Sequence, residues 1–555
     1  MIAKLEENRV IIRDCYDVKD QVRTVLGAIW DRPRRLWTLP LSEETVELLK
    51  QYCFPIDPPI LEAWELKKSA TKQAADIKTN KLDISKIPMK SIKNCTPYLH
   101  QVRGYLLGLA NDNYCYALDM GTGKSLIMIA VMGERFRRGQ VKRVVIVCPK
   151  SLMFNWQREL EKYANFEFTS LVLTGKLTTR EENLRAFRPQ NGLGIVIINY
   201  EIVDLFLSHL KFYGGDMYIL DECQKIKNPS TKVSKALQKL GDKVPYRYVL
   251  SGTIIQNKVI DIFSVYKFMD KDIYGSSYHK FKMRYCEIGG FGGMQIIGYK
   301  NMEEFKEKFH AKAFRATKAE VLDLPDQLDQ DLIIEFTPGS LAERSYIRIK
   351  KEMYASLESG DSITAPNALT KLLRLQQLCG GFIKTDEGVV RKMGDEKIGI
   401  LKELLIQFVQ EEGQKVVIFC RFLAEFNAIK FALEFLKIGF VSINGDVSAE
   451  QRDWTVDQFQ TNNFVRVFLG QIQCVSTGLT LTKAHTCIYY SMSFNFADYD
   501  QSRARIHRIS QEFPCLYIHM LIKGSVDEYI LQKVREKKSI SDDILDDWRR
   551  LAGEL

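Results

Sequence analysis

The sequence predicts an α/β protein with two parallel-sheet cores and a small α+β module at its N-terminal end. Three observations lead to this expectation. First, 555 residues are too many for a single hydrophobic core. Second, apolar strand-like runs alternate with amphipathic helices in two separate series, which is typical of βαβ units. Third, the alternation disappears between the two series, over about residues 258–398, where the chain becomes helical and charged.

The chain is therefore expected to divide into six parts. In chain order they are the α+β module (1–60), a basic linker (61–95), the first core with a helical insertion (96–335), a helical insertion before the second core (336–398), the second core (399–524), and a closing helix with a tail (525–555). The linker is assigned from its many lysines and weak periodicity.

The strands of each part are placed by their apolar runs. In the N-terminal module a strand is expected at 10–12, a helix at 18–30, and a turn at 31–34 that enters another strand. The first core should contain strands at 114–118, 143–148, 169–173, 194–199, 217–220 and 247–250. The second should contain strands at 415–419, 439–443, 466–469, 486–490 and 515–521.

Composition narrows the class of protein. Lys and Arg number 79 against 69 Asp and Glu, a formal charge of +10 that suits a protein binding a polyanion but is also common in other enzymes. Twelve cysteines stand as singletons, so neither a disulfide framework nor a structural zinc site is expected. No uncharged apolar run is long enough to span a bilayer, and the first residues do not resemble a signal peptide, so we expect no membrane association and a cytosolic location.

A glycine-bearing loop follows the first strand of the first core. It reads Met120-Gly121-Thr122-Gly123-Lys124-Ser125 and precedes a helix. Such glycines let backbone amides approach phosphate oxygens, while Lys124 can contact the β- and γ-phosphates and Ser125 can bind Mg²⁺. Leu118 stands where the full phosphate-loop pattern has its first glycine, so the loop alone also fits an ordinary turn before a helix.

Two acids end a later apolar strand. Asp221 and Glu222 follow Met217–Leu220, about a hundred residues after the glycine loop. At the carboxyl end of a strand beside bound phosphates, Asp221 can hold Mg²⁺ and Glu222 can deprotonate a water molecule. The alternative is a solvated strand end, which this apolar context disfavours.

Two further groups of residues fit the same chemistry. The amide of Gln101 can pair with adenine, and an arginine pair, Arg505 and Arg508, would share one helix face and could neutralise charge on a γ-phosphate. On such a helix Gln501 and Arg505 also share a face. A basic helix face is otherwise simply solvated.

Arginines and tryptophans gather in the N-terminal module. Arg32, Arg34 and Arg35 stand beside Trp30 and Trp37 and could stack bases and bind phosphates. The equally open alternative is a turn with solvated arginines whose tryptophans fill a small core.

In order and spacing these stretches resemble the motifs of superfamily 2 helicases, specifically the SWI/SNF-type ATPases, over nearly all of residues 96–546. The matches are 119–125 with motif I, 147–156 with Ia, 221–228 with II, 250–257 with III, 417–420 with IV, 476–482 with V and 501–511 with VI. Segments 314–325 and 373–379 resemble the family's helical insertions, and 525–530 its brace helix. Residues 30–41 resemble the HARP domain of annealing helicases, which assists recognition of branched DNA. Gln224 and Ser510 depart from the usual histidine and glycine.

The resemblance implies two tandem RecA-like parallel-sheet lobes with helical SWI/SNF-type insertions. It also implies an ATPase stimulated by DNA that uses ATP and Mg²⁺ and translocates on double-stranded or branched DNA, as a monomer, beside single-stranded-DNA-binding or replication and repair proteins. The compact size suits a bacterial or phage protein in the cytoplasm, or a nuclear one in a eukaryote. A strand-separating DNA or RNA helicase is one alternative, and an ATP-switched binding protein without motor activity is another.

The resemblance also assigns roles to individual residues. Catalysis falls to Lys124, Asp221, Glu222, Arg505 and Arg508, with Ser125 and Asp221 holding the metal. ATP binding falls to Gln101, Met120, Gly121, Thr122, Gly123, Lys124, Ser125, Gly478 and Gln501. Coupling falls to Gln224, Ser251 and Thr253, and DNA binding to Ser151, Asn199, Thr480, Arg32, Arg34 and Arg35.

Overall fold

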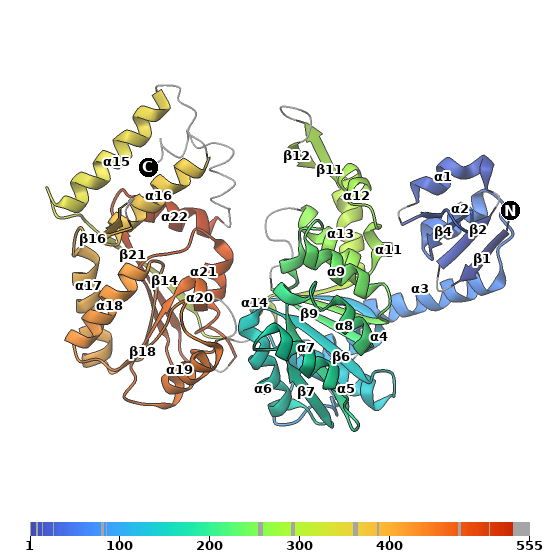
Figure 1. Cartoon of the computed structure of the whole chain (residues 1–555), viewed down its shortest axis with the longest axis horizontal. Helices are drawn as coiled ribbons and strands as arrows, with labels where there is room; N and C mark the ends of the chain where they lie inside the picture. Colours follow the sequence, from blue (N-terminus) through green and yellow to red (C-terminus); the bar gives the residue numbers. More distant parts are fainter. Residues whose placement is uncertain are drawn as a thin grey trace. The chain divides into compact units, whose positions relative to one another are not determined.

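Two compact units make up the chain, Met1–Val321 and Leu322–Leu555. The computed structural model (Figure 1) describes residues 2–6, 9–13, 15–25, 27–78, 83–84, 86–252, 259–289, 295–322, 324–358, 365–385, 388–475, 479–509 and 511–536. Within this described part, no helix has both the length and the apolar character needed to cross a bilayer.

The N-terminal module is an antiparallel sheet of order β1-β2-β4-β3 with two short helices. The elements are β1 (Ile2–Glu6), β2 (Arg9–Arg13), α1 (Lys19–Thr24), β3 (Ile29–Asp31), β4 (Leu36–Pro40) and α2 (Glu43–Gln51). The helix expected over 18–30 is wrong in extent, because Val25 turns to extended ψ and Gly27 takes φ 89° before the chain enters β3. Ser42 caps α2 by accepting a hydrogen bond from the Thr45 amide.

A 21-residue helix, α3 (Pro58–Lys78), occupies about half of the segment predicted to be a linker (Figure 1). Its lysines, alanines and glutamates favour helix, but few of its residues are buried, so its apolar periodicity is weak in the sequence. Ile60, Ala74 and Ile77 are among those buried. The helix connects the N-terminal module with the first large sheet.

The first large sheet has seven parallel strands in the order β13-β5-β10-β9-β6-β8-β7. Every expected strand of the first series is present within one residue of its predicted bounds, as β5 (Asn113–Leu118), β6 (Arg143–Cys148), β7 (Phe168–Val172), β8 (Leu193–Asn199), β9 (Met217–Asp221) and β10 (Tyr246–Ser251). The connecting helices are α4 (Leu99–Ala110), α5 (Lys124–Arg137), α6 (Met153–Tyr163), α7 (Leu177–Ala186), α8 (Leu207–Tyr213) and α9 (Lys232–Gly241).

One strand of this sheet was not expected. β13 (Ala313–Ala316) pairs in parallel with β5, so Phe314 lies in a sheet and not in a helical insertion. Four residues are too few to show a strand period inside a helical region. The insertion before it contains α10 (Ile262–Met269), α11 (Lys271–Tyr274), α12 (Tyr278–Tyr285), the hairpin β11 (Cys286–Gly289) with β12 (Gln295–Tyr299), and α13 (Met302–Ala311). An ion pair between Arg9 of the N-terminal module and Asp272 of α11 anchors the module to this insertion.

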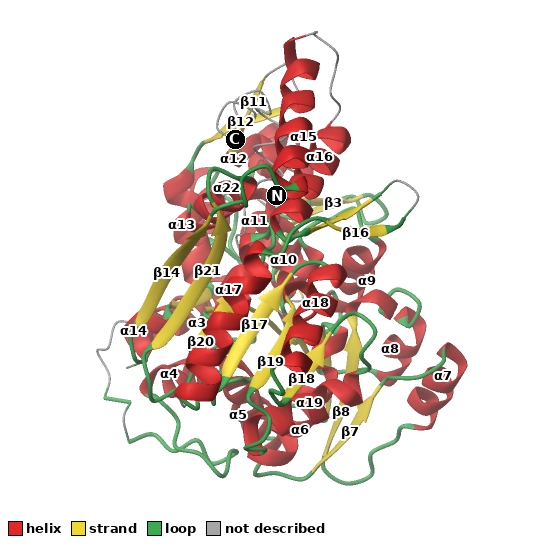
Figure 2. Ribbon diagram, turned by 90° about the vertical axis from the view of Figure 1, so that its left-hand side faces the viewer, coloured by secondary structure: helices red, strands yellow, loops and turns green. Residues whose placement is uncertain are grey.

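The second unit is built on six parallel strands in the order β14-β21-β20-β17-β19-β18 (Figure 2). The five expected strands are present as β17 (Val416–Cys420), β18 (Phe440–Ile443), β19 (Val467–Gln471), β20 (Thr486–Tyr489) and β21 (Cys515–Ile522). The sixth, β14 (Gln327–Ile334), lies at the edge and is mostly exposed, so its polar sequence does not look like a strand. The predicted boundary at residue 335 is therefore wrong, since β14 belongs to the second unit.

Helices surround the second sheet. They are α15 (Leu341–Glu358), α16 (Ala365–Cys379), α17 (Glu396–Leu405), α18 (Leu423–Phe435), α19 (Ala449–Thr461), α20 (Ile472–Val475), α21 (Phe496–Arg503) and α22 (Val526–Arg535). A buried ion pair of 2.6 Å joins Lys397 of α17 to Asp527 of α22. This contact ties the last described helix to the core of the unit.

Candidate nucleotide-binding site

The sheet order brings the predicted motifs of the first unit together. β10 lies between β5 and β9, with Ser251 opposite Ala117 and Leu250 opposite Asp221. All three strands are parallel, so the glycine loop after β5, the acids after β9 and the serine that ends β10 meet at one edge. The carboxyl ends of parallel strands are where α/β proteins bind ligands.

The glycine loop is shaped for close approach of a ligand to its backbone. Gly121 and Gly123 have φ values of 82° and 87°, which other residues rarely adopt, and α5 begins directly after them at Lys124. The ammonium group of Lys124 donates to the carbonyl oxygens of Leu118 at 2.8 Å and Asp119 at 3.3 Å. The loop therefore presents the start of a 14-residue helix, whose free amides and dipole favour an anion.

Gln101 packs directly against this loop. Its Oε1 accepts from the Tyr98 amide at 2.9 Å and its Nε2 donates to the Thr122 carbonyl at 3.1 Å. A Cβ at Gly123 would lie 2.2 Å from that Nε2, so only glycine fits there without displacing the amide. His100, which the sequence did not single out, also contacts the Thr122 carbonyl, at 2.8 Å. Both side chains brace the loop from behind.

Asp221 is buried and held from two sides. The indole Nε1 of Trp156 donates to its Oδ2 and the Glu222 amide donates to its Oδ1, each at 3.0 Å. Burial, together with the neighbouring charge of Glu222, raises the pKa of Asp221, and Lys124 opposes this effect. Two adjacent buried carboxylates beside a single lysine fit a divalent cation, whose charge would stabilise the ionised form of both.

Glu222 continues into a chain of hydrogen bonds. It has a left-handed φ of 53°, a strained conformation for a residue with a side chain. Its Oε2 accepts from Nε2 of Gln224 at 2.6 Å, and the Oε1 of Gln224 accepts from the Ser251 hydroxyl at 2.8 Å. Gln224 thus links the end of β9 to the end of β10. Thr253, predicted to act with Ser251, lies outside the described residues.

Two residues predicted to bind DNA lie at the same edge of the sheet. Asn199 ends β8, is buried, and donates to Glu201 at 2.7 Å. Ser151 lies in the single turn after β6. A further contact at this edge was not predicted from the sequence. The Tyr200 hydroxyl donates to the Asp221 carbonyl at 2.8 Å. No local sequence signal marks that contact, because the residues are 21 positions apart.

The predicted arginine pair lies in the second unit and is held differently from expectation. The prediction that it lies on a helix is wrong, because α21 ends at Arg503 and the chain continues in turns over 504–509. Arg505 and Arg508 still converge, since each donates from Nη1 to the Leu479 carbonyl at 3.2 Å. Arg508 also donates to the Thr480 hydroxyl at 2.8 Å.

Of the predicted ATP-binding residues, Gln501 lies beside this arginine turn. The Gln501 carbonyl accepts from Arg505 Nε at 2.9 Å, and the Gln501 side chain is largely buried. Gly478 lies outside the described residues, as does Ser510.

In the N-terminal module the predicted arginines separate into two groups. Arg34 forms an ion pair of 2.6 Å with Glu6. Arg32 and Arg35 instead line a groove of about 510 Å³. Its other lining residues are Ile12, Cys15, Tyr16, Lys19, Arg23, Trp30 and Trp37. Trp37 is buried in the module's core, as the second alternative predicts, whereas Trp30 is 47% exposed and does not fill that core.

Comparison with known proteins places the chain in a family. The model of the SNF2-related domain matches residues 99–381, which is half of the chain, and that of the helicase conserved C-terminal domain matches 396–510. The chain belongs to the SNF2-related family. This confirms the expected fold class of two tandem RecA-like units with a small α+β module. The SNF2-related match begins at α4 and includes the glycine loop, the two acids and Gln224.

Individual relatives of this SNF2-related chain are distant. An uncharacterized ATP-dependent helicase of Mycoplasma pneumoniae is 22% identical over 95% of the chain, and the DNA repair and recombination protein RAD54-like of Drosophila yakuba is 25% identical over 79% of the chain and 60% of its own length. A Sulfolobus solfataricus SWI2/SNF2 ATPase core in complex with dsDNA is 26% identical, with a TM-score of 0.40 over 83% of this chain and 94% of that one. The chain spans about half the length of the curated relatives it matches first.

Proposed function

We propose that this SNF2-related chain hydrolyses ATP and uses the energy to translocate on double-stranded DNA. The observation that carries the proposal is the hydrogen-bonded chain from Glu222 through Gln224 to Ser251, beside a glycine loop and the buried Asp221. A strained, oriented carboxylate next to a phosphate-binding loop is suited to activating water, and a solvated strand end would need none of these contacts.

Each residue of the edge then has a task in hydrolysis. The loop amides and Lys124 bind and orient the phosphates, Asp221 with Ser125 would hold Mg²⁺, and Glu222 accepts the proton of the attacking water. When bound, the cation shields the phosphate charge. Trp156 keeps the Asp221 carboxylate in place through its 3.0 Å hydrogen bond. We propose that Gln101 serves the ATP site by holding the glycine loop in shape, and that Gln501 is an ATP-binding residue of the second unit.

We infer that Arg505 and Arg508 serve the same reaction by neutralising charge on the γ-phosphate in the ATP-bound state. Their common anchor on the Leu479 carbonyl is a weak neutral acceptor that phosphate oxygens would replace at a gain in energy. Removing a guanidinium that contacts a transferring phosphoryl group typically costs several orders of magnitude in rate. Gly478, Met120 and Thr253 complete the proposed nucleotide and coupling site.

Double-stranded DNA is the proposed track. The relatives include proteins named for DNA repair and recombination, and the chain carries a net charge of +10. Phosphate contacts from Ser151, Asn199 and Thr480 at the two sheets would make binding largely independent of sequence and sensitive to salt. Translocation without full strand separation is the proposal, and unwinding by a strand-separating helicase is the outcome that would replace it.

The N-terminal groove supports a preference for branched DNA. Among the described residues, its lining holds four basic side chains and no acidic one, with Trp30 and Tyr16 exposed among them. Exposed aromatic rings between cations can stack unpaired bases while the cations bind the backbone. We propose that Arg32 and Arg35 contact DNA here, as in a HARP-like module, and that Arg34 contributes less because Glu6 already pairs with it.

ATPase assays on the full chain test the proposal. Turnover should rise with blunt duplex and rise further with a fork or four-way junction, and the protein should displace a triplex-forming strand from blunt duplex without unwinding tailed duplexes. Unwinding of tailed duplexes would show a strand-separating helicase. ATP binding without turnover would show an ATP-switched binding protein.

A further inference from the structure

We propose that strand β14 positions the two arginines of the second unit, through a hydrogen-bonded network that joins Gln327 and Asp329 to Arg503 and His507. This inference rests on the proposed role of Arg505 and Arg508 in ATP hydrolysis. It assigns to the edge strand, which the sequence motifs do not include, control over the turn that carries both arginines.

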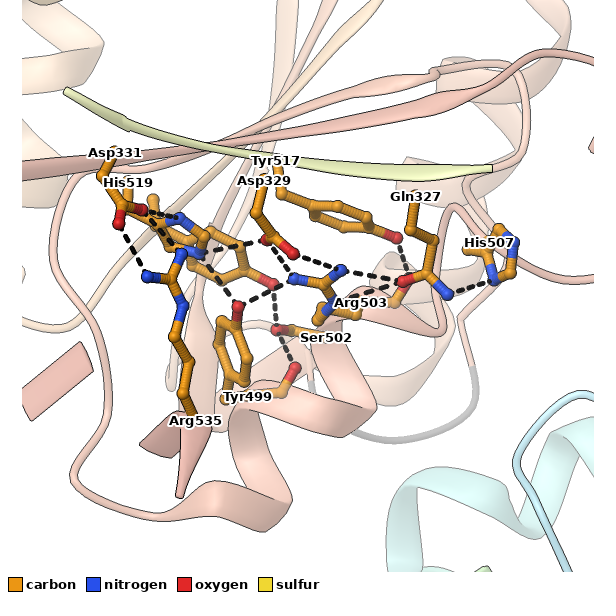
Figure 3. Close-up of polar contacts among 11 residues, drawn as sticks. Gln327, Asp329, Asp331, Tyr499, Ser502, Arg503, His507, Tyr517, His519 and Arg535 are labelled. Atoms are coloured by element: carbon orange, nitrogen blue, oxygen red, sulfur yellow. Dashed lines mark hydrogen bonds and ion pairs between the residues drawn. The ribbon is translucent and has the colours of Figure 1, made fainter. Parts of the chain in front are cut away.

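Arg503 is the centre of the network (Figure 3). It ends α21 and precedes Arg505 by two residues. Its guanidinium donates to both carboxylate oxygens of Asp329, including a 3.1 Å bond to Oδ2, and to Oε1 of Gln327 at 2.9 and 3.2 Å. Paired acceptors on a planar guanidinium fix its orientation as well as its distance. The end of α21 is therefore held against β14.

His507 extends the network into the turn itself, because it stands between the two arginines. Nε2 of Gln327 lies 3.0 Å from His507 Nδ1 (Figure 3). His507 Nε2 lies 2.8 Å from the Pro325 carbonyl. The Oε1 of Gln327 is occupied by Arg503, so its amide group must face the ring and donate to Nδ1. His507 then carries its proton on Nε2 and donates to Pro325. A single arrangement of donors satisfies both contacts.

Aromatic packing removes the remaining freedom of Arg503. Its guanidinium lies 3.9 Å from the ring centre of Tyr517, whose hydroxyl donates to the Arg503 carbonyl at 3.0 Å, and Nη1 donates to the Tyr499 hydroxyl at 2.8 Å. The Arg503 side chain is 15% exposed. The network is thus more than a solvated surface ion pair, which would constrain neighbouring residues little.

The network lies close to the start of the second unit in the chain. The second unit begins at Leu322, and Pro325, whose carbonyl binds His507, lies three residues later. Pro325 therefore joins the first residues of the second unit to the turn that carries Arg505 and Arg508. The two arginines are anchored on their other side by Leu479. Breaking the β14 contacts would leave the bonds of the two arginines to Leu479, Gln501 and Thr480 in place and remove the restraints on Arg503 and His507.

The same strand supplies a matched control. Asp331 lies two residues after Asp329 and therefore on the same face of β14. It forms a bidentate pair with Arg535 of α22, at 2.6 and 2.7 Å, and lies 3.2 Å from His519, without reaching the arginine turn. Asp331→Asn removes a comparable ion pair from the same strand and leaves every direct contact of Arg503 and His507 in place, so it reports the structural cost of losing a carboxylate from β14.

The test measures kcat and KM for ATP with saturating duplex DNA, together with Tm, for Gln327→Leu, Asp329→Asn, Asp329→Glu and Asp331→Asn in the full chain. We expect Gln327→Leu and Asp329→Asn to lower kcat about tenfold with KM changed by less than about twofold. Asp329→Glu should recover part of the loss, because it keeps a carboxylate for Arg503. Asp331→Asn should lower Tm about as much as Asp329→Asn does, but should leave kcat within about twofold of the wild-type value.

The outcomes separate this inference from the proposed function. Arg505→Ala is included in the series. The positioning role alone would be overturned if the wild type is active, Arg505→Ala is inactive, and Gln327→Leu and Asp329→Asn are both fully active. Equal losses of kcat in Asp329→Asn and Asp331→Asn would also overturn it. A wild type without ATPase activity, or a fully active Arg505→Ala, would instead overturn the proposed function. If Asp329→Asn does not fold, Gln327→Leu, which removes no charge, decides the question.

Discussion

Glu222 receives a 2.6 Å hydrogen bond from the side-chain amide of Gln224. The other end of that amide accepts from Ser251, so a neutral residue joins the carboxylate to the next strand of the sheet. The resemblance to the helicase motifs implies a histidine at this position. An amide has one donor end and one acceptor end and does not titrate near neutral pH, so its two contacts persist across the physiological range.

We expect Gln224→Ala to lower the stimulation of ATPase activity by DNA about tenfold, because Glu222 loses its orienting donor and Ser251 its acceptor. Gln224→His should keep most of the stimulation, since an imidazole also offers one donor and one acceptor. The measurement is the ratio of turnover with and without duplex DNA. Equal ratios in the wild type and Gln224→Ala would show that this link does not couple the two activities.

We expect Lys124→Ala to lower ATP turnover about 100-fold or more, because the phosphates lose their only charged contact from the loop. DNA binding, measured by fluorescence anisotropy, should be unchanged. Lys150→Ala, a lysine in the turn after β6 at the same sheet edge, is the control for a simple loss of positive charge. Wild-type turnover in Lys124→Ala would remove the nucleotide-site assignment.

The second unit should lose stability at acid pH through His519. Burial lowers the pKa of His519 to about 4, with Asp329 and Asp331 opposing this effect. The unfolded chain takes up a proton near pH 6.5 and the folded chain does not, so stability falls as the pH falls from about 6.5 to about 4. Between pH 7 and 5 the free energy of unfolding should drop by about 2 kcal/mol more in the wild type than in His519→Gln, measured by urea titration. Equal drops in both proteins would contradict the neutral buried state.

The buried pair of Lys397 and Asp527 should matter strongly for the second unit. Removing one partner leaves a buried charge uncompensated, so Lys397→Met should lower the free energy of unfolding by about 3–5 kcal/mol. Lys523→Met, which breaks an exposed pair with Glu335, is the control and should leave stability unchanged. Chemical denaturation measures both. A small effect of Lys397→Met would mean that the methionine packs well enough to compensate and that Asp527 finds another partner.

The N-terminal groove should distinguish DNA structures. Trp30→Ala and Arg32→Ala should each reduce the preference for fork over blunt duplex about threefold to tenfold, because base stacking and phosphate contacts are both lost. Arg34→Ala, in the same turn but paired with Glu6, is the matched control. Anisotropy competition between fork and duplex measures the preference. A loss as large in Arg34→Ala would place the DNA contact outside the groove.

Much of the fold was predictable because it depends on local patterns. The strands of both parallel sheets are short apolar runs between amphipathic helices, and burial of both sheet faces imposes that pattern on the sequence. β14 was missed because an edge strand buries little, and its Gln327, Asp329 and Asp331 serve polar contacts. α3 was assigned as a linker, with a helix only as the alternative, because most of its surface is exposed and its apolar periodicity is weak.

The sequence by itself determined the two-core α/β architecture, the glycine loop with Lys124, and the acidic pair of Asp221 and Glu222, since each of these depends on residues close together in the chain. Only the tertiary structure decided that Gln224 bridges to Ser251, that Trp156 and Tyr200 hold Asp221, and that β14 binds the arginine turn. The residues that these contacts join lie between 21 and 180 positions apart in the sequence. Strand order and register bring such residues together, and no local pattern of one sequence records either.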